Sequence, residues 1–279
     1  MFKNDLLAGH RVLITGGGTG IGRSIGRRFL TLGAEIVICG RRENVLAEAA
    51  AELTRETGGR VSYRTCDVRD AAQVDALCEW IWSANPLTGL INNAAGNFIA
   101  QSEALSPRAV DAVLGIVLHG SAYMTLNCGK RWLSTGGKGN VLSIITTYAW
   151  TGSAYVVPSA MAKAGVLALT RSLAVEWGGR GIRLNAIAPG PFPTAGAWER
   201  LVPKPELAAM FEAKNPLRRA GRHEELANLA AFLMADDVSY INGEVVTIDG
   251  GEWLQGAGQF NFVGQHMTDA DWQSLRAKK

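Results

Sequence analysis

The sequence predicts an α/β protein in which a doubly wound parallel sheet is covered by helices on both faces. Short apolar runs alternate with segments of helical spacing along the whole chain, the pattern of parallel strands joined by helical crossovers. No linker or change of composition divides the 279 residues, so we expect one domain over 1–279. A hydrophobic content of 47% is enough for a substantial core.

The predicted strands are short apolar runs. The first, "RVLIT" at Arg11–Thr15, ends at a run of glycines. The others follow at 35–40, 61–68, 89–96, 140–146, 182–190 and 244–251. Strands that are buried on both faces of a sheet have such continuous apolar runs rather than alternating ones. The runs therefore indicate strands in the middle layer of the fold.

Helical spacing fills the intervals between these strands. The predicted helices lie at 21–34, 43–59, 70–84, in two segments over about 106–135, up to about 179, and near 222–235. The helix at 43–59 has acidic residues near its start and Gly58 at its end, as helix termini favour. Two embellishments interrupt the pattern: a Pro-rich insertion at 190–221, which we expect to act as a substrate lid, and a C-terminal tail at 252–279.

Composition and charge exclude several classes of function. The formal net charge is only +3 and Lys/Arg runs do not exceed pairs, so we expect no nucleic-acid partner. The four cysteines form no CxxC and the four histidines have no ligand-like spacing, which predicts reduced thiols and no metal. The first residues do not fit a signal peptide, and we expect no apolar run long enough to span a bilayer. These observations predict a cytoplasmic protein with no membrane partner.

A glycine-rich turn joins the first strand to the first helix. In "TGGGTGIG" (Thr15 to Gly22), Gly16 permits the tight turn and Gly20 the close approach of a phosphate. Gly22 lets the helix pack closely on the strand. Because a strand precedes the motif and a helix follows it, the motif predicts a Rossmann-type dinucleotide site.

The end of the second strand selects the dinucleotide. NAD sites usually place an acidic residue there, whereas this chain has "CGRR" with Arg41 and Arg42. A guanidinium binds a 2′-phosphate that a carboxylate would repel, so the sequence predicts NADPH, with Arg41 as the main contact. Arg42 has the alternative of being a solvated helix-start residue. Asp67, at the end of the third strand, is predicted to face the adenine.

Five motifs together resemble the short-chain dehydrogenase/reductase family from end to end. They are "TGGGTGIG", "NNAAG", "SAMAKAG", "IRLNAIAPG" and "VTIDGG", and they follow in family order. The resemblance implies a doubly wound sheet of about seven strands and a homotetramer. The chain departs from the family at Ser159, four residues before Lys163, where most members have the catalytic Tyr, and at Val117, where most have Asn.

These departures resemble one branch of the family, the 2,4-dienoyl-CoA reductases of the mitochondrial and bacterial single-domain type. The resemblance rests on "INNAAGNF", "YVVPSAMAKAGV", "APGPFPTAGAWERL" and "HEELANLAAFL". In that branch the acid is a Tyr just past the preceding strand, which is Tyr148 here, and its partner Asn is Asn97. Lys163 is expected to hold the nicotinamide ribose, and Ser159 to orient Lys163 or the cofactor. Tyr155 is the rival phenol.

The resemblance implies NADPH-dependent reduction of a 2,4-dienoyl-CoA to trans-3-enoyl-CoA in fatty acid β-oxidation. Hydride arrives at C5, and the negative charge spreads to the thioester oxygen, so the site needs hydrogen-bond donors such as a phenol and an amide N–H. The proton donor to the α-carbon is not identified by the sequence. The alternatives are a reductase of another conjugated or enoyl thioester, a carbonyl reductase of the family, and a non-catalytic cofactor-binding scaffold.

The expected contacts complete this prediction. The cofactor contacts are Gly16, Gly18, Thr19, Gly20, Ile21, Gly22, Arg41, Arg42, Asp67, Val68, Asn93, Ala94, Ala95, Gly96, Lys163, Pro189, Gly190 and Phe192. The resemblance assigns contacts with the acyl-CoA substrate to Arg69, Phe98 and Arg200.

Overall fold

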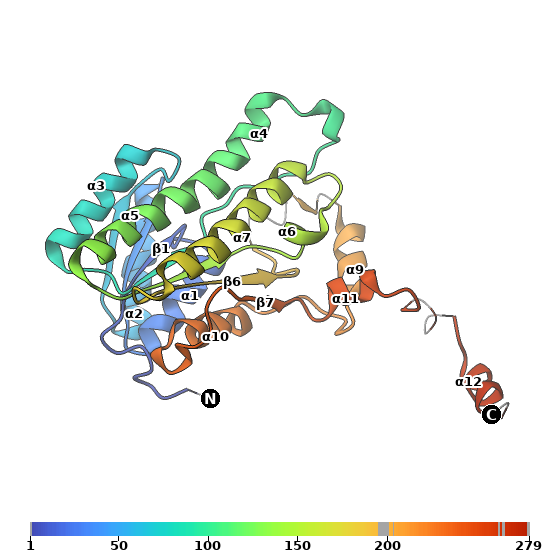
Figure 1. Cartoon of the computed structure of the whole chain (residues 1–279). Helices are drawn as coiled ribbons and strands as arrows, with labels where there is room; N and C mark the ends of the chain where they lie inside the picture. Colours follow the sequence, from blue (N-terminus) through green and yellow to red (C-terminus); the bar gives the residue numbers. More distant parts are fainter. Residues whose placement is uncertain (1, 195–200, 203, 262, 264–265, 278–279) are drawn as a thin grey trace.

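A computed structural model describes residues 2–194, 201–202, 204–261, 263 and 266–277 (Figure 1). Within this part of the chain, seven strands form one sheet in the order β3-β2-β1-β4-β5-β6-β7, and every neighbouring pair is parallel. The strands are β1 (Arg11–Thr15), β2 (Glu35–Gly40), β3 (Val61–Thr65), β4 (Gly89–Asn92), β5 (Gly139–Ile144), β6 (Ile182–Pro189) and β7 (Val245–Ile248). The predicted doubly wound sheet of about seven strands is confirmed.

Helices cover both faces of the sheet. One face carries α1 (Gly20–Thr31), α2 (Glu43–Thr57) and α10 (His223–Met234); the other carries α3 (Ala71–Ala84), α5 (Gly120–Thr135) and α7 (Val157–Gly178). The side chains of β1 explain why both faces of the sheet are covered by helices. Val12 and Ile14 pack in the buried cluster of the first face, whereas Leu13 packs in that of the second, because successive side chains of a strand point to opposite faces. The continuous apolar run of β1 therefore contributes side chains to the hydrophobic cores on both faces of the sheet.

The strand order reverses between β1 and β4, and this places the site. Strands on either side of such a switch point lead into loops that diverge, which leaves a crevice at their carboxyl ends. The glycine turn follows β1 and leads into α1 at Gly20, while "NNAAG" follows β4. The segment after β5 leads through the four-residue helix α6 (Tyr148–Thr151) to α7, so the predicted catalytic residues reach the same edge of the sheet.

Pro107–Thr135 forms one continuous helix of 29 residues. It comprises α4 (Pro107–Leu114), a π-helical turn η2 (Gly115–His119) and α5. Among the helices that the structure describes, it is the one that is long and apolar enough to span a bilayer. The expectation that no apolar run reaches this length is therefore wrong. Core helices pass the same test, and this one packs against α3 and α7.

The two embellishments contain helices that the sequence reading did not predict. The insertion after β6 includes α9 (Pro205–Lys214), and the C-terminal tail includes α11 (Glu252–Ala257) and α12 (Asp269–Ala277). Short 3₁₀ turns η1 (Ser102–Ala104) and η3 (Asp236–Val238) lie in loops. Figure 1 shows α12 well outside the body of the sheet and its helices, whereas α11 stays close to it. Of the tail residues that the structure describes, those of α11 therefore lie nearest the crevice.

Candidate active site

A single cavity of about 1660 Å³ occupies the crevice at the carboxyl ends of the strands. It brings together segments that lie far apart in the sequence, from the glycine turn to α11. The predicted site residues that line it are Gly16, Gly18, Thr19, Gly20, Ile21, Arg41, Arg42, Asp67, Val68, Asn93, Ala94, Ala95, Gly96, Asn97, Tyr148, Ser159, Lys163, Pro189, Gly190 and Phe192. Apart from Gly22, which does not line it, the predicted cofactor and catalytic residues thus share one space.

The glycine turn is built as the motif predicts. Gly16 and Gly20 have left-handed backbones, with φ of +66° and +53°, which glycine adopts without strain. A Cβ at Gly22 would lie 2.5 Å from the amide nitrogen of Asn93 and 2.7 Å from the carbonyl oxygen of Gly16. Gly22 therefore allows α1 to pack on the turn itself and on the loop after β4. Asn93 braces the turn by donating from Nδ2 to the carbonyl of Thr15 at 2.9 Å.

The start of α1 suits an anionic group. Thr19 stands at the N-cap with an extended backbone, and its side chain accepts no capping hydrogen bond. The first turn of α1 contains no acidic residue, and Gly20 and Ile21 line the cavity. Because the first N–H groups of a helix have no partner within the helix, this end can bind phosphate oxygens. The glycine turn therefore fits a dinucleotide diphosphate.

The end of β2 supplies positive charge without a competing acid. Arg41 and Arg42 are exposed and line the cavity. Within the described residues, no hydrogen bond or ion pair engages either guanidinium. Charged donors that are not committed to a protein partner are what a bound phosphate requires. These residues fit a cofactor that carries a 2′-phosphate.

Asp67 and Arg69 are bound to each other. The Arg69 guanidinium donates to both carboxylate oxygens of Asp67, at 2.9 Å and 3.0 Å from Nε and at 2.5 Å from Nη2. This hydrogen bonding, more than the nearby Arg41, holds the pKa of the Asp67 carboxyl below its usual value. Asp67 lines the cavity, as predicted, but Arg69 does not line it. A CoA contact by Arg69 stays a prediction that requires it to leave this pair.

Tyr148 lies at the centre of a hydrogen-bonded group. Asn97 donates from Nδ2 to the Tyr148 hydroxyl at 3.2 Å, and that hydroxyl is 3.1 Å from Ser159 Oγ. Asn97 Oδ1 accepts from the backbone N–H of Phe98 at 2.9 Å, which fixes the amide so that its NH₂ group points to the phenol. Burial raises the pKa of Tyr148, and hydrogen bonds to Ser159 and Thr146 oppose this rise. The phenol therefore stays protonated and can donate.

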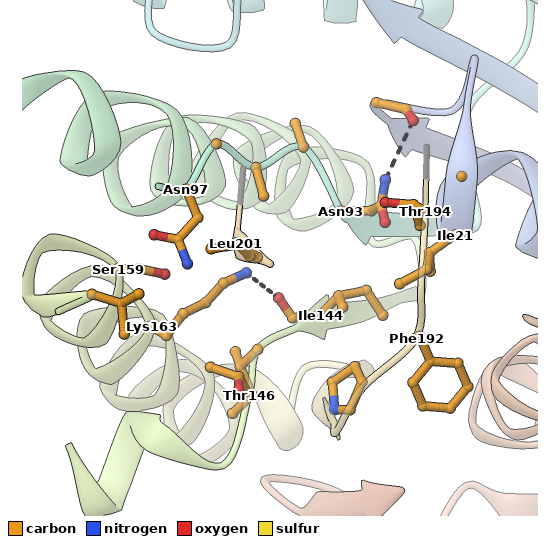
Figure 2. A pocket seen from close by; sticks show the side chains of 18 of the residues that line it. Ile21, Asn93, Asn97, Ile144, Thr146, Ser159, Lys163, Phe192, Thr194 and Leu201 are labelled. Carbon is orange, nitrogen blue, oxygen red and sulfur yellow. Dashed lines mark hydrogen bonds between the residues drawn. The ribbon is translucent and has the colours of Figure 1, made fainter. Parts of the chain in front are cut away.

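Lys163 lies one helical turn beyond Ser159 on α7, as its spacing predicts. Its ammonium group donates to the carbonyl of Ile144 at the end of β5, and burial lowers its pKa to about 8. In Figure 2 the side chains of Asn97, Ser159 and Lys163 point into the same space, from the loop after β4 and from α7. An ammonium group has three N–H donors, so those not bound to Ile144 remain for a ligand.

The rival phenol, Tyr155, also lines the cavity but lies at its rim. Its side chain is 61% exposed, whereas the Tyr148 hydroxyl contacts both Asn97 and Ser159. Tyr155 has a left-handed backbone, with φ of +66°, and its carbonyl accepts from the N–H of Ala100 at 2.9 Å. Its backbone thus ties the loop after Asn97 to the segment before α7. The geometry favours Tyr148 as the donor at the site.

The predicted substrate contacts find less support. Phe98 does not line the cavity but packs against the buried cluster of Val113, Val117 and Val166, because Asn97 before it takes the inward direction. Ile99 lines the cavity instead. Arg200 lies outside the described residues. The apolar lining on this side comes from Val156, Leu201, Val202, Phe211 and Trp253.

Several lining residues were missed by sequence reasoning. Thr146 and Thr147 line the cavity just before Tyr148, and their place at the end of an apolar strand was the available signal. Helix α11 contributes Glu252, Trp253, Gly256 and Ala257, although the sequence reading treated this region only as a tail. Trp253 contacts Trp150 of α6 edge-on, with ring centroids 6.1 Å apart. The tail therefore completes the wall beside Tyr148.

Glu252 adds a carboxyl group to this wall. Burial first, and the neighbouring Asp249 second, raise the pKa of Glu252, while Lys214 opposes them. A Cβ built on Gly190 would lie 3.3 Å from Glu252 Oε2, so the carboxyl group borders the turn after β6. A carboxylic acid whose pKa is raised can keep a proton at a pH where an ordinary glutamate has lost it. Glu252 is thus a second ionisable group in the cavity wall, besides Tyr148, whose acid form is favoured by its surroundings.

Known proteins resemble this chain over most of its length. A family model described as Enoyl-(Acyl carrier protein) reductase matches residues 16–252. A Bacillus subtilis protein named "Probable 2,4-dienoyl-CoA reductase [(2E)-enoyl-CoA-producing]" is 44% identical over 245 residues, covering 87% of this chain and 96% of that protein. A Caenorhabditis elegans protein named "Probable 2,4-dienoyl-CoA reductase 3 [(3E)-enoyl-CoA-producing]" is 40% identical over 274 residues, covering 96% and 86%.

Solved structures give the same picture of the fold. A short chain dehydrogenase from Bacillus anthracis superposes with a TM-score of 0.80 at 41% identity, covering 88% of this chain and 96% of that chain. A protein from Beutenbergia cavernae, assigned as an NAD(P)-dependent gluconate 5-dehydrogenase and solved with NADP at low occupancy, superposes with a TM-score of 0.85 at 32% identity. The match covers 90% of this chain and 100% of that chain.

Proposed function

This chain belongs to the short-chain dehydrogenase/reductase family, and on that premise we propose that it is an NADPH-dependent 2,4-dienoyl-CoA reductase. The observation that carries the proposal is the group of Asn97, Tyr148 and Ser159 beside Lys163. The names of the curated relatives support the substrate class, and the NADP-bound neighbour supports a nicotinamide cofactor. Arg41 and Arg42 support NADPH over NADH.

The bound cofactor supplies a hydride, and the chain supplies the site that receives the charge. Hydride addition at C5 of the dienoyl thioester shifts both double bonds and leaves the negative charge on the thioester oxygen. The Tyr148 O–H can donate to that oxygen because Asn97 already donates to the phenol from the other side. The second N–H of the Asn97 amide is a further donor. Two such donors form an oxyanion hole for the dienolate.

Ser159 and Lys163 support this pair in different ways. When Tyr148 gives its proton to a hydrogen bond with the substrate, the Ser159 hydroxyl can donate to the phenol oxygen over the existing 3.1 Å contact. Lys163 is held at the end of β5 by Ile144, and its free N–H groups are available to cofactor hydroxyls. Neither residue needs to transfer a proton to a carbonyl, which suits a reaction at a carbon remote from the oxygen.

A proton must then reach the α-carbon, where it restores the thioester carbonyl and leaves the double bond between C3 and C4. We assign this proton to Glu252, directly or through water. Burial raises its pKa, which favours the acid form, and it lines the cavity at the turn after β6. The carboxylate that remains regains a proton from solvent. The product is then a trans-3-enoyl-CoA, as the C. elegans relative is named, whereas protonation at C4 would give the 2-enoyl product of the B. subtilis relative.

The test is NADPH oxidation with three thioesters: a trans-2,trans-4-dienoyl-CoA, a simple trans-2-enoyl-CoA and a β-ketoacyl-CoA. Selective oxidation with the dienoyl ester is the expected result, and product analysis gives the position of the remaining double bond. Faster oxidation with the enoyl ester would favour reduction of simple enoyl thioesters, and preference for the ketone would favour a carbonyl reductase. NADPH binding without turnover of any of them would favour a scaffold. The homotetramer and the cytoplasmic location also stay predictions.

A further inference from the structure

The segment Pro191–Thr194, which follows β6, lies over the glycine turn. A Cβ built on Gly20 would lie 3.1 Å from Thr194 Cγ2, and Figure 2 shows Thr194 beside Ile21 at the start of α1. Phe192 anchors the segment in the core that α1 and α10 share. A ligand at the start of α1 is therefore bordered by this segment as well as by the turn.

One side chain joins the segment to α1. His223, the first residue of α10, contacts the carbonyl of Pro193 from Nε2 at 2.9 Å. Its other ring nitrogen, Nδ1, is 3.1 Å from Ser24 Oγ on α1, and Ser24 Oγ donates to the carbonyl of Gly20 at 3.1 Å. The contacts run in one line from the segment, through the imidazole and the hydroxyl, to the glycine turn.

The number of protons on His223 and Ser24 determines whether all three hydrogen bonds can form at once. The Pro193 carbonyl can only accept, so Nε2 must carry a proton. The single proton of the Ser24 hydroxyl is needed for the Gly20 carbonyl, so Nδ1 must also carry a proton and donate to Ser24 Oγ. A neutral imidazole has only one N–H and leaves one of the three bonds unmade. The full set therefore requires the doubly protonated, cationic ring.

The charges around His223 act in both directions. The positive end of the α10 dipole disfavours a cation at its first residue, whereas a phosphate at the glycine turn would favour it. The charged side chains on the adjoining elements are Arg218 and Arg219 in the preceding loop, Arg222, Glu224 and Glu225 at the start of α10, and Arg23, Arg27 and Arg28 on α1. Arg219 and Arg222 pair with Glu225, and Arg23 and Arg27 pair with Glu52 and Glu56. A phosphate bound at the glycine turn would therefore add a negative charge that favours the cationic form of His223.

We propose that His223 is a positioning residue that fastens Pro191–Thr194 to α1, and that its doubly protonated form holds the cofactor more tightly than its neutral form. The proposal rests on the cofactor site of the proposed function. Because linkage is reciprocal, binding of the cofactor also promotes protonation of His223. The second ring proton is gained as the pH falls, so the proposal predicts tighter cofactor binding at lower pH.

The first experiment compares NADPH dissociation constants and dissociation rates at a fixed pH of about 6. His223→Leu removes both donors, and we expect an increase of about tenfold in the dissociation constant, the size of one to two hydrogen bonds. Ser24→Ala removes the middle link and should raise it about threefold. Glu79→Gln, at an exposed position of α3 on the other face of the sheet, is the control and should leave it unchanged. The value of kcat/KM for the thioester at saturating NADPH should stay within about twofold of wild type in all variants, because none of these residues touches the substrate half.

The second experiment uses pH and a conservative variant. His223→Gln offers one N–H donor and one acceptor, as a neutral imidazole does, but it cannot become cationic. We divide its NADPH dissociation constant by that of the wild-type protein. The titration of the cofactor phosphate affects both constants equally and cancels in this ratio. We expect a ratio of about five at pH 6 and below about two at pH 8.

Either experiment can overturn the proposal. A His223→Leu protein that binds NADPH as wild type does shows that His223 does not position the segment. A ratio that is the same at both pH values shows that the second proton is not used. If the wild-type protein binds neither NADPH nor NADH, the proposed cofactor itself is wrong and both proposals fail together.

Discussion

Asn97 donates a hydrogen bond from its side-chain amide to the hydroxyl of Tyr148 at 3.2 Å, although the two residues are 51 positions apart. The contact joins the loop after β4 to the helix after β5, which are neighbouring strands of the sheet. Because the Phe98 N–H holds the other end of the amide, the direction of this donation is set by the backbone. The hydroxyl proton of Tyr148 is not used in this contact and can be donated to another acceptor.

Replacing the phenol tests whether Tyr148 carries the reaction. In Tyr148→Phe the donor to the developing oxyanion is lost, so we expect kcat with a dienoyl-CoA to fall by at least about two orders of magnitude. The NADPH dissociation constant should not change. The matched control is Tyr155→Phe, which alters a phenol at the cavity rim and should retain most of the activity. A large loss in that control, with Tyr148→Phe active, would reverse the assignment.

Two changes at Asn97 separate loss of a donor from the introduction of charge. Asn97→Ala removes the N–H donors and should lower kcat about a hundredfold. Asn97→Asp keeps an acceptor for the Phe98 N–H, but it places a carboxylate where the negative charge develops. Like charges repel, so kcat should fall further than in Asn97→Ala. Steady-state kinetics of both variants, with NADPH affinity as the reference, give the comparison. Equal activities of the two variants would contradict an oxyanion at this position.

The preference for NADPH should depend on Arg41. Hydrogen bonds to charged groups contribute about 1.5–3 kcal/mol, so Arg41→Ala should raise the NADPH dissociation constant by at least about tenfold. The NADH dissociation constant should stay nearly constant, because NADH lacks the 2′-phosphate. Arg42→Ala serves as the comparison and should have the smaller effect. Fluorescence titration measures all four values, and parallel changes for the two cofactors would exclude a 2′-phosphate contact.

Burial of Lys163 should be visible in the stability of the cofactor-free protein. Its folded pKa of about 8 lies below the ordinary value of 10.5, so the unfolded chain binds more protons between these values and stability from this group increases with pH. Lys163→Met removes this cost, and we expect it to raise the free energy of unfolding relative to wild type at about pH 7 by up to a few kcal/mol. The gain should shrink towards about pH 10. Urea unfolding at both pH values measures it, and a gain independent of pH would show that the lysine is not buried as a cation.

The assignment of Glu252 predicts a specific pH profile. The acid form is the donor, so kcat of the wild-type protein should fall as pH rises through the raised pKa of Glu252. Glu252→Gln should be slower by about one to two orders of magnitude and should lose that limb of the profile. Glu206→Gln, at an exposed position on α9, is the control. An unchanged profile in Glu252→Gln would assign the proton to another group.

The sequence was sufficient for the elements of the sheet, because most strands are apolar runs with a turn behind them; the edge strand β3, which is mostly exposed, is the exception. It also predicted that Tyr148 and Lys163 lie in the same cavity, because their elements meet at one edge of the sheet. It did not reveal that Arg69 is bound by the acidic residue two positions before it. Nor did it reveal that Phe98 packs away from the cavity, since the sequence does not show which of two adjacent side chains turns inward. Helix α11 has six residues, too few for a periodic signal.

Helix α6 has only four residues, and it carries Tyr148. A Tyr and a Lys on one helix keep their spacing for as long as that helix exists, whereas here Tyr148 and Lys163 stay aligned only while α6 remains packed on α7 and, through Trp150, on Trp253. Short segments held by a few contacts open locally at a lower free energy than the core. On gentle heating the protein should therefore lose its catalytic geometry while the sheet is still folded, so inactivation should precede melting.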